Sequence, residues 1–185
     1  MLYPLPAVMV TCADEQGKAN VMTAAWTGTI CSDPVMVYVS IRKERHSHDI
    51  IERTGEFVIN LTTRNLAKVT DFVGVRSGRT MDKFALEKEL KLTPSRSRYV
   101  KAPGIEESPV SLECKVEQIL RLGSHDMFIA KVVSTDINPE LLDETGRFRL
   151  DMADLIAYNH GEYRALGKLL GTFGYSVRKK KRGRK

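Results

Sequence analysis

A basic segment that ends in a serine is a place where this sequence could bind a charged ligand. The run from Arg42 to Arg45 holds three basic residues and leads into Ser47, which we expect to cap a short helix over residues 48–53 that Gly55 ends. A helix N-terminus offers unpaired N–H groups and the positive end of a dipole. With a hydroxyl and a guanidinium beside it, this segment predicts a phosphate site. The alternative is an ordinary capped helix after a solvated basic loop.

A run of small side chains lies upstream and is broken by the only tryptophan of the chain. We expect a strand over residues 23–28, in which Thr23, Ala24 and Ala25 precede Trp26. Small side chains let a flat ligand approach the backbone, and a tryptophan beside them could close one end of a pocket. The alternative is that Trp26 is an ordinary core residue.

The sequence shows no hydrolytic or metal-binding constellation. It has no nucleophile elbow, no paired His and Cys ligands and no G-x-G-x-x-G segment after a strand. His46 and His48 are two residues apart and could both face a metal ion from an extended segment, but no third ligand follows at a suitable spacing. We therefore expect no metal site.

One strand organises the stretch from Asn20 to Leu61. It follows a turn at residues 32–34, and one of its faces carries β-branched side chains that suit a pleated core surface: Val35, Val37, Val39 and Ile41. Its other face is mixed, with Met36, Tyr38, Ser40 and Arg42. A mixed face is expected where one side of a strand packs in the protein and the other faces a ligand or a partner.

Helical periodicity is confined to the middle of the chain. Apolar residues recur at three- and four-residue spacing from Leu66 to Val73, which predicts a short amphipathic helix that ends at Gly74. A second short helix is expected over residues 82–90. The segment 94–109 is rich in Ser, Arg and Pro and reads as a long surface connection.

Strand patterns surround these helices. Strict alternation over residues 112–117 predicts a strand that faces Cys114 inward and Glu113 outward, and its phase slips at residues 119–120, which predicts a β-bulge or a bend. A hairpin at residues 123–126 should lead to a further strand. Short strands at this spacing favour a mainly β fold, an antiparallel barrel with peripheral helices.

Length and composition are those of one soluble domain. The chain has 185 residues, of which 42% are hydrophobic and 28% charged. No apolar run reaches the length of a membrane span, and the N-terminus lacks the features of a signal peptide. The three cysteines are Cys12, Cys31 and Cys114, an odd number without a C-x-x-C pair, which indicates reduced thiols in a cytoplasmic protein.

The net charge of +6 belongs to the C-terminus. Residues 178–185 hold seven of the 29 basic residues and no acidic one, which leaves 22 basic against 23 acidic residues elsewhere. The body therefore has no electrostatic signature of nucleic-acid binding. We expect one domain over residues 1–176 and a disordered basic tail over residues 177–185, with contact of this tail to RNA, membrane or an acidic partner as the alternative.

Several segments match a known family in their order along the chain. They are Asn20-Val-Met-Thr-Ala-Ala-Trp26, the Cys31–Pro34 turn, the strand into Ser40-Ile-Arg42, Ser47, Gly55–Asn60, Ser77–Phe84, Pro109–Cys114 and Gly123–His125. Together they resemble the flavin reductase-like family of FMN-binding split barrels, and the flavoredoxin-type members are most similar. The resemblance extends from about Tyr3 to Tyr175.

The resemblance implies an antiparallel FMN-binding split β-barrel that holds FMN non-covalently, about one per chain. It also implies a homodimer with FMN at the subunit interface and NADH or NADPH as electron donor, since split-barrel reductases bind a nicotinamide without a Rossmann motif. Small-molecule or protein electron acceptors are expected, without membrane or nucleic-acid partners.

Site residues follow from the same resemblance, position by position. Asn20 and Trp26 match residues at the edge and wall of the isoalloxazine, Ser47 with Arg42 nearby matches the phosphate end, and Lys83 matches a lysine that reaches FMN, from its own or the facing subunit. His125 matches the histidine of a Gly-x-His hairpin near the ring, and Tyr158 a C-terminal aromatic residue beside the flavin. Together with Thr23 and Ala24 these are the expected cofactor-binding residues.

Three of these positions have structural alternatives. Lys83 could be an exposed helix cation, His125 a turn residue and Tyr158 a core aromatic. Ser124 departs from the commoner Gly-Asp-His, which puts the nicotinamide-side contacts in doubt.

Three functions stay open from the sequence. The first is an FMN-dependent oxidoreductase that passes electrons from NAD(P)H to free flavin, ferric iron or a protein acceptor. The second is a non-catalytic FMN-binding electron carrier that another enzyme reduces. The third is a nucleic-acid- or membrane-tethered protein in which the basic tail dominates.

Overall fold

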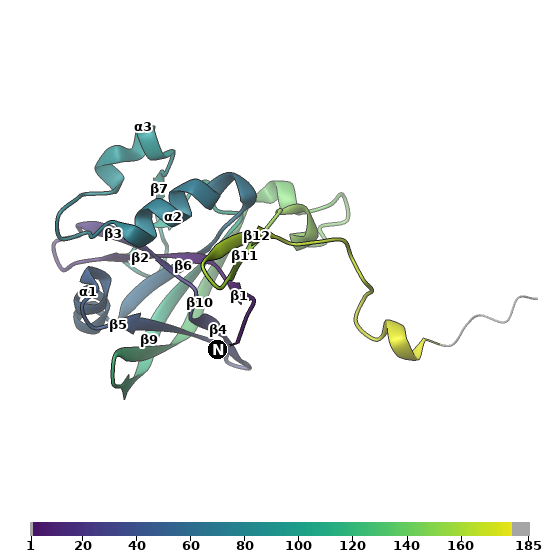
Figure 1. Cartoon of the computed structure of the whole chain (residues 1–185), viewed down its shortest axis with the longest axis horizontal. Coiled ribbons are helices and arrows are strands. Elements are labelled where there is room, and N and C mark those ends of the chain that lie inside the picture. The colour runs from purple at the N-terminus through teal and green to yellow at the C-terminus, as the bar shows by residue number, and fades with distance from the viewer. Residues whose placement is uncertain (1, 179–185) are drawn as a thin grey trace, which may run out of the picture.

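An antiparallel seven-stranded sheet forms the body of the protein (Figure 1). The computed structural model describes residues 2–178, except for the side chain of Glu87. The strand order is β3-β2-β6-β9-β10-β5-β4. These strands are β2 Val8–Ala13, β3 Ala19–Ala24, β4 Thr27–Ser32, β5 Val35–Arg42, β6 Glu56–Leu61, β9 Val110–Leu122 and β10 His125–Ile137.

Two smaller sheets and several short helices surround this body. A three-stranded sheet joins β1 Leu5–Pro6, β11 Ile156–Asn159 and β12 Glu162–Ala165, and a two-stranded ribbon joins β7 Pro94–Ser95 and β8 Gly104–Ile105. The α-helices are α1 His46–Thr54, α2 Ala67–Val75 and α3 Glu87–Leu90. The 3-10 turns are η1 Arg64–Leu66, η2 Phe84–Leu86, η3 Pro139–Leu141, η4 Leu150–Met152 and η5 Tyr175–Val177. The expectation of a mainly β fold with peripheral helices is confirmed.

The main core lies on one face of the large sheet. The predicted alternation in β5 is confirmed at Val37, Val39 and Ile41, which are at most 4% exposed, whereas Val35 at the strand's start is exposed. Ile50 and Ile51 bring α1 onto this core. Helix α2 packs on a second cluster formed with β2 and β3, which includes Met9, Val21, Leu66, Val69 and Val73.

Helix α1 begins earlier than the sequence predicts. Arg45 occupies the N-cap position and makes no side-chain cap, while Ser47 lies inside the first turn. The predicted Ser47 cap is therefore wrong, because the Ser47 hydroxyl instead accepts a 2.7 Å hydrogen bond from the Asn20 amide. Gly55 does end the helix as predicted, with φ 68 and its N–H bonded to Ile51 O.

The chain bends where a continuous strand was expected over residues 23–28. Strand β3 ends at Ala24 and β4 begins at Thr27, whose N–H donates to Ala25 O at 3.1 Å. Trp26 lies in this bend, and its carbonyl accepts the N–H of Ser40 at 2.8 Å. The bend turns Trp26 out of the strand, and 40% of its surface is exposed.

Packing overrides two local patterns in the helical part of the chain. Gly74 does not end α2, which continues to Val75; a Cβ at Gly74 would lie 3.0 Å from the Thr23 Cβ, so its small size serves the contact between α2 and β3. The helix expected over residues 82–90 is split into the turn η2 and the short helix α3.

Glu113 is buried, contrary to the alternation predicted for residues 112–117. Its carboxylate is 1% exposed and accepts the backbone N–H groups of Arg98 and Tyr99 at 2.9 and 2.7 Å. The segment 94–109 is therefore not only a surface connection, because it covers this carboxylate and forms β7 and β8.

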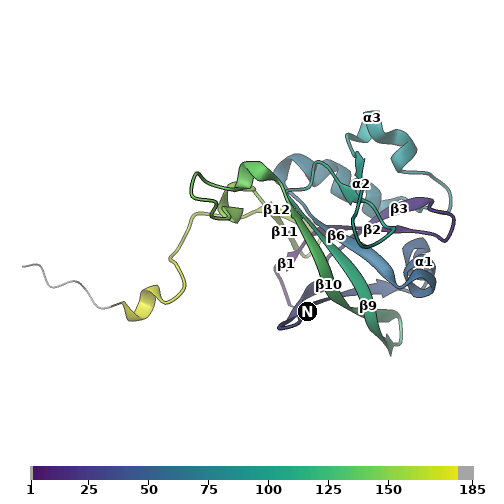
Figure 2. The ribbon, with the colours of Figure 1, turned by 180° about the vertical axis from the view of Figure 1, so that it is seen from behind.

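The expected irregularity in this strand is present but lies earlier than residues 119–120. The pairing register of β9 with β10 shifts at Glu117, and β10 has a second shift at Val133. Figure 2 shows the long β9–β10 hairpin from behind. In the described part of the chain, no helix is long and apolar enough to cross a membrane.

Candidate functional site

Two adjoining pockets contain all nine residues that the sequence predicts at the site. We call them the tryptophan pocket, of about 390 Å³, and the arginine pocket, of about 330 Å³. Met22, Arg42 and Arg45 line both. The tryptophan pocket holds Thr23, Ala24, Trp26, Arg42, His125 and Tyr158, and the arginine pocket holds Asn20, Arg42, Ser47 and Lys83.

Aromatic side chains from three different elements line the tryptophan pocket. Trp26 follows β3, His125 begins β10, and Tyr158 lies in β11. The rings of Trp26 and His125 have centroids 4.4 Å apart and are tilted by 31°. Tyr158 contacts the rings of Tyr3 and Tyr163, so it belongs to an aromatic cluster at the rim and is not simply a core residue.

His125 is held as a neutral imidazole beside Trp26. His125 pairs with Arg42 where strands β10 and β5 lie side by side. Burial lowers the pKa of His125 below its ordinary 6.5, and the charge of Arg42 is the second cause. The Ser124 hydroxyl lies 2.9 Å from Nδ1. An uncharged, hydrogen-bonded ring therefore faces the pocket near neutral pH.

Small residues bring backbone close to the floor of the same pocket. The Thr23 hydroxyl donates to Thr70 O of α2, and Gly74 lies against Thr23. Ala24 is 6% exposed. Small side chains of β3 and Gly74 of α2 thus line this part of the pocket.

Cationic side chains dominate the arginine pocket. Arg42, Arg45, Arg76 and Lys83 line it, against the single carboxylate of Glu44, which lies 3.5 Å from the Arg42 guanidinium. Arg45 is fixed by a 2.9 Å hydrogen bond from Nη1 to Gly74 O. Such a site favours an anion.

Lys83 is buried, so the alternative of an exposed helix cation is wrong. It is 3% exposed, and its Nζ donates to Val21 O at 2.6 Å and Val73 O at 2.8 Å. Burial, with the charge of Arg45 second, lowers the pKa of Lys83 to about 8. An ammonium has three donors, so the two bonds to carbonyls leave a third, and Lys83 lines the arginine pocket.

A close backbone turn and a buried nitrogen without a partner complete the arginine pocket. A Cβ at Gly78 would lie 2.2 Å from Asn20 Oδ1, so only glycine allows the loop to approach there. His46 Nδ1 is buried without a hydrogen-bond partner, and burial followed by the charge of Arg79 lowers the pKa of His46. His46 also lines the arginine pocket.

The sequence reasoning missed Arg45, Arg76 and Tyr163 as pocket residues. Arg45 belongs to the basic run at residues 42–45, so its place in that run could have indicated a role in the phosphate site. Arg76 and Tyr163 carry no local signal, because α2 and the β11–β12 hairpin bring them to the site only in the folded chain. Burial, with the charge of Asp71 second, raises the pKa of Tyr163 to about 12.

His46 and His48 do not form a pair facing one metal ion. Both lie in α1, where residues two apart point in different directions. His48 Nε2 is instead 2.9 Å from the buried carboxylate of Asp126. Among the described residues, no group of three or more His, Cys, Asp or Glu side chains could hold a metal.

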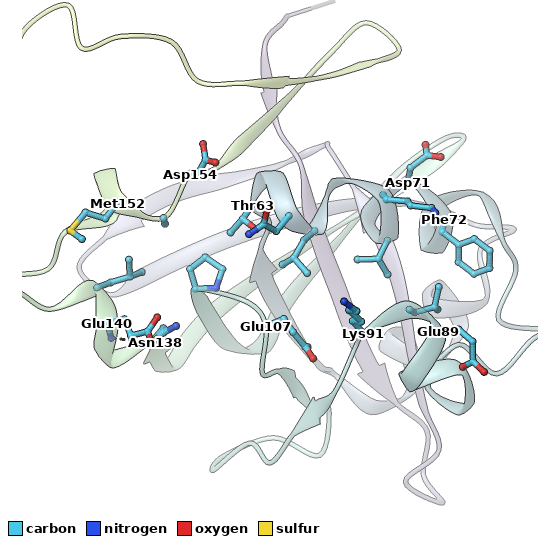
Figure 3. Close-up of a pocket in the computed structure, with 18 of the residues that line it drawn as sticks. Thr63, Asp71, Phe72, Glu89, Lys91, Glu107, Asn138, Glu140, Met152 and Asp154 are labelled. Carbon is cyan, nitrogen blue, oxygen red and sulfur yellow. Dashed lines mark hydrogen bonds between the residues drawn. The ribbon is translucent and has the colours of Figure 1, made fainter.

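A larger cavity of about 1100 Å³ lies on the other side of α2 and contains none of the predicted residues (Figure 3). It is lined from η1, α2, the end of α3, η3 and η4. We call it the outer groove. Asp71, Val75 and Arg76 of the α2 region border both it and the two pockets, so this helix separates them.

The barrel with its adjoining aromatic and cationic pockets defines a split-barrel flavoprotein. The chain belongs to the family of the flavin reductase like domain, whose model matches residues 1–167. The resemblance inferred from the motifs and the split β-barrel fold are thus both confirmed.

Three known proteins illustrate the range of the family. The structure of the flavoredoxin of Desulfovibrio vulgaris (Miyazaki F) is 29% identical, with a TM-score of 0.87 over 96% of this chain and 95% of that one. The NADH-dependent flavin reductase StyB of Pseudomonas fluorescens is 27% identical over 71% of this chain and 71% of its own length. The high molecular weight rubredoxin of Moorella thermoacetica is 31% identical over 68% of this chain and 53% of its own length.

Proposed function

We propose that this protein is an FMN-dependent oxidoreductase that takes electrons from NADH or NADPH and delivers them to free flavin, ferric iron or a protein acceptor. One observation carries the proposal: a pocket lined by aromatic side chains and a cationic pocket adjoin and share Arg42 and Arg45. FMN has the matching shape, a flat ring system joined to a phosphate.

The arginine pocket suits the phosphate. Arg42, Arg45 and Lys83 supply charge, and the Ser47 hydroxyl lies in the first turn of α1, where N–H groups are unpaired. Asn20 orients that hydroxyl through the 2.7 Å bond from its amide.

The tryptophan pocket suits the ring. The small side chains of Thr23 and Ala24 would admit the isoalloxazine face, while Trp26 and Tyr158 would exclude water from its edges. Bound FMN would supply the hydride and electron chemistry, and the protein sets orientation and access.

We assign the contact with a nicotinamide to His125, which lines the tryptophan pocket beside Trp26. As a neutral ring beside Trp26, it can accept or donate one hydrogen bond without adding charge. The flavin reductase StyB is described as NADH-dependent, which supports a nicotinamide donor.

An anaerobic absorbance titration tests this function. Purified protein should carry a yellow chromophore, about one FMN per chain, that NADH or NADPH bleaches. Colourless protein that takes up no FMN on titration would contradict the proposal, whereas yellow protein that neither nucleotide bleaches would remove only the reductase step.

That second result is the one expected for an electron carrier that another enzyme reduces. The likeness to a flavoredoxin and to a rubredoxin supports this candidate, because both names describe redox proteins. The carrier should bleach once a separate reductase and its nucleotide are added, which distinguishes it from an inactive flavoprotein.

We also propose a homodimer in the cytoplasm with FMN near the subunit interface. The exposure of Trp26 at 40% supports this arrangement, because an aromatic pocket open to solvent gains from a covering surface. The boundary of the domain at residue 176 stays a prediction, and residues 179–185 of the expected basic tail lie outside the described residues.

A further inference from the structure

Asp126 is a buried carboxylate that lines neither pocket. It directly follows His125 in β10 and shares the buried face of this strand with Phe128 and Ala130, all three being 0% exposed. An ionised carboxylate on such a face costs free energy unless charged or polar partners replace the water that it loses.

Three basic side chains surround this carboxylate. His48 Nε2 of α1 donates to Asp126 Oδ2 at 2.9 Å, Arg121 Nη1 of β9 donates to the same oxygen, and Lys43 Nζ lies 3.7 Å from Oδ1. Burial raises the pKa of Asp126, but the hydrogen bonds from Arg121 and His48 and the charge of Lys43 outweigh it and hold this pKa below its ordinary 3.8. Asp126 is therefore ionised at neutral pH.

The segments that meet at this carboxylate each carry a pocket residue. They are the loop after β5, the first turn of α1 and the start of β10. In each segment the residue at the carboxylate directly follows a residue that lines a pocket: Lys43 follows Arg42, His48 follows Ser47, and Asp126 follows His125. One buried carboxylate thus joins the backbone segments that bear these three pocket side chains.

Stability alone does not account for Asp126. Removing charges from water costs about as much as a buried ion pair regains, and apolar side chains of similar volume are often at least as stable. A buried carboxylate with several partners is satisfied only while the segments that supply them keep one arrangement. The contribution of Asp126 is therefore to geometry.

We propose that Asp126 is a positioning residue, which sets Arg42 and Ser47 of the arginine pocket and His125 of the tryptophan pocket relative to one another. Strand pairing supports this role, since His125 lies opposite Arg42, and Asp126 opposite Ile41, in the β10–β5 pair. The inference rests on the proposed FMN site and deepens it by naming a residue outside both pockets that aligns them.

The pKa of His125 tests this positioning without any flavin. It is read from the ring-proton NMR signals of the full-length protein as purified, and His125→Gln identifies these signals. Asp126→Asn removes a nearby negative charge, which by itself would lower the pKa of His125 further. A ring that leaves its place beside Arg42 and becomes more exposed has a pKa that rises towards its ordinary 6.5. We expect this rise, and an unchanged or lower pKa overturns the proposal.

FMN affinity tests the positioning at the arginine pocket. At matched folded fractions, Asp126→Asn should weaken FMN binding by at least about tenfold, because Arg42 and Ser47 no longer meet the phosphate together. His48→Leu removes the link to α1 and leaves the carboxylate with its other two partners, so it also tests the proposal where Asp126→Asn folds poorly. It should weaken FMN binding by a similar factor.

Glu52→Gln is the matched control for both variants. Glu52 is an exposed carboxylate of α1 that also accepts a hydrogen bond from Arg121. Exposed ion pairs contribute little, so this variant should bind FMN within about twofold of wild type. Equal losses in Asp126→Asn and Glu52→Gln, or an FMN affinity that neither Asp126→Asn nor His48→Leu lowers, overturns the positioning role. Wild type that takes up no FMN contradicts the proposed function instead, and the pKa of His125 then decides this inference.

Discussion

The two adjoining pockets are built by different means. In the arginine pocket, buried hydrogen bonds fix the side chains before any ligand arrives: Lys83 is held by two backbone carbonyls, Arg45 by a third and Ser47 by Asn20. In the tryptophan pocket, ring contacts join side chains from separate elements, and Trp26 remains substantially exposed.

Because of this difference, we expect one pocket to set the affinity for the cofactor and the other to set the access of a second molecule to it. A preorganised cationic pocket loses little side-chain entropy when it binds an anion, so it should supply most of the affinity. A pocket walled by exposed rings can admit a second flat molecule, which a reductase must exchange at each turnover. The arginine pocket should therefore hold the cofactor and the tryptophan pocket should expose it.

The largest effect is expected from Lys83→Met. The variant removes a charged donor from the phosphate and leaves the carbonyls of Val21 and Val73 without their partner. Hydrogen bonds to charged groups contribute about 1.5–3 kcal/mol, so FMN affinity should fall by about a hundredfold, with a lower thermal midpoint. Fluorescence titration with FMN measures the affinity. Lys88→Met, an exposed lysine in α3, is the control, and equal losses in both variants would remove Lys83 from the site.

The second effect is a loss of FMN affinity at alkaline pH. The pKa of Lys83 in the free protein is about 8, so the ammonium loses its proton as the pH rises through this value. By pH 9 the affinity of the protein for FMN should be about tenfold lower, because one pH unit above the pKa leaves roughly a tenth of the lysine charged. Riboflavin should show no such fall, and Lys83→Met should flatten the FMN profile. A profile that stays the same in this variant would assign the titration to another group.

A smaller effect is expected from Trp26→Ala. Ring contacts contribute about 0.5–1.5 kcal/mol, so FMN and riboflavin should both weaken by about three- to tenfold. Tyr99→Ala is the control, since Tyr99 is 59% exposed and lines neither pocket. If Trp26→Ala lowers the affinity for FMN but not for riboflavin, the ring system does not lie in the tryptophan pocket as proposed.

The smallest effect is expected from a chain that stops after Arg178. This deletion removes six basic residues, none of which is among the described residues that line the two pockets. FMN content and reductase turnover should stay within about twofold of wild type, since a run of like charges without apolar residues cannot form a packed core. Loss of FMN on truncation would contradict this.

The fold could be predicted from the sequence because several short motifs occur in the order that the family has, and the nine residues expected at the cofactor site all line the two pockets. Asn20, Ser47 and His125 lie in separate segments, yet each matched the family in its own short motif. The buried face of β5 could also be predicted, since β-branched side chains that alternate along a strand indicate a face that packs in the core.

Long-range contacts account for what could not be predicted. Ser47 has the chemistry of a helix cap, but its hydroxyl accepts a hydrogen bond from the amide of Asn20 in strand β3. The alternating pattern of residues 112–117 predicts that Glu113 faces solvent. The loop that covers Glu113 donates two backbone N–H groups to its carboxylate, which makes its burial possible. Lys83 gave no local sign of burial, because its carbonyl partners come from β3 and α2.

The most direct test of the central claim compares FMN with riboflavin, which lacks only the phosphate. Both are titrated into wild type, Arg42→Ala and Ser47→Ala, with thermal unfolding measured to match the folded fractions. Wild type should prefer FMN, and each variant should weaken FMN by roughly ten- to a hundredfold, since one hydrogen bond to a charged group is lost, while riboflavin binding hardly changes. Equal weakening of both ligands, or no weakening of either, would show that the phosphate does not lie in the arginine pocket.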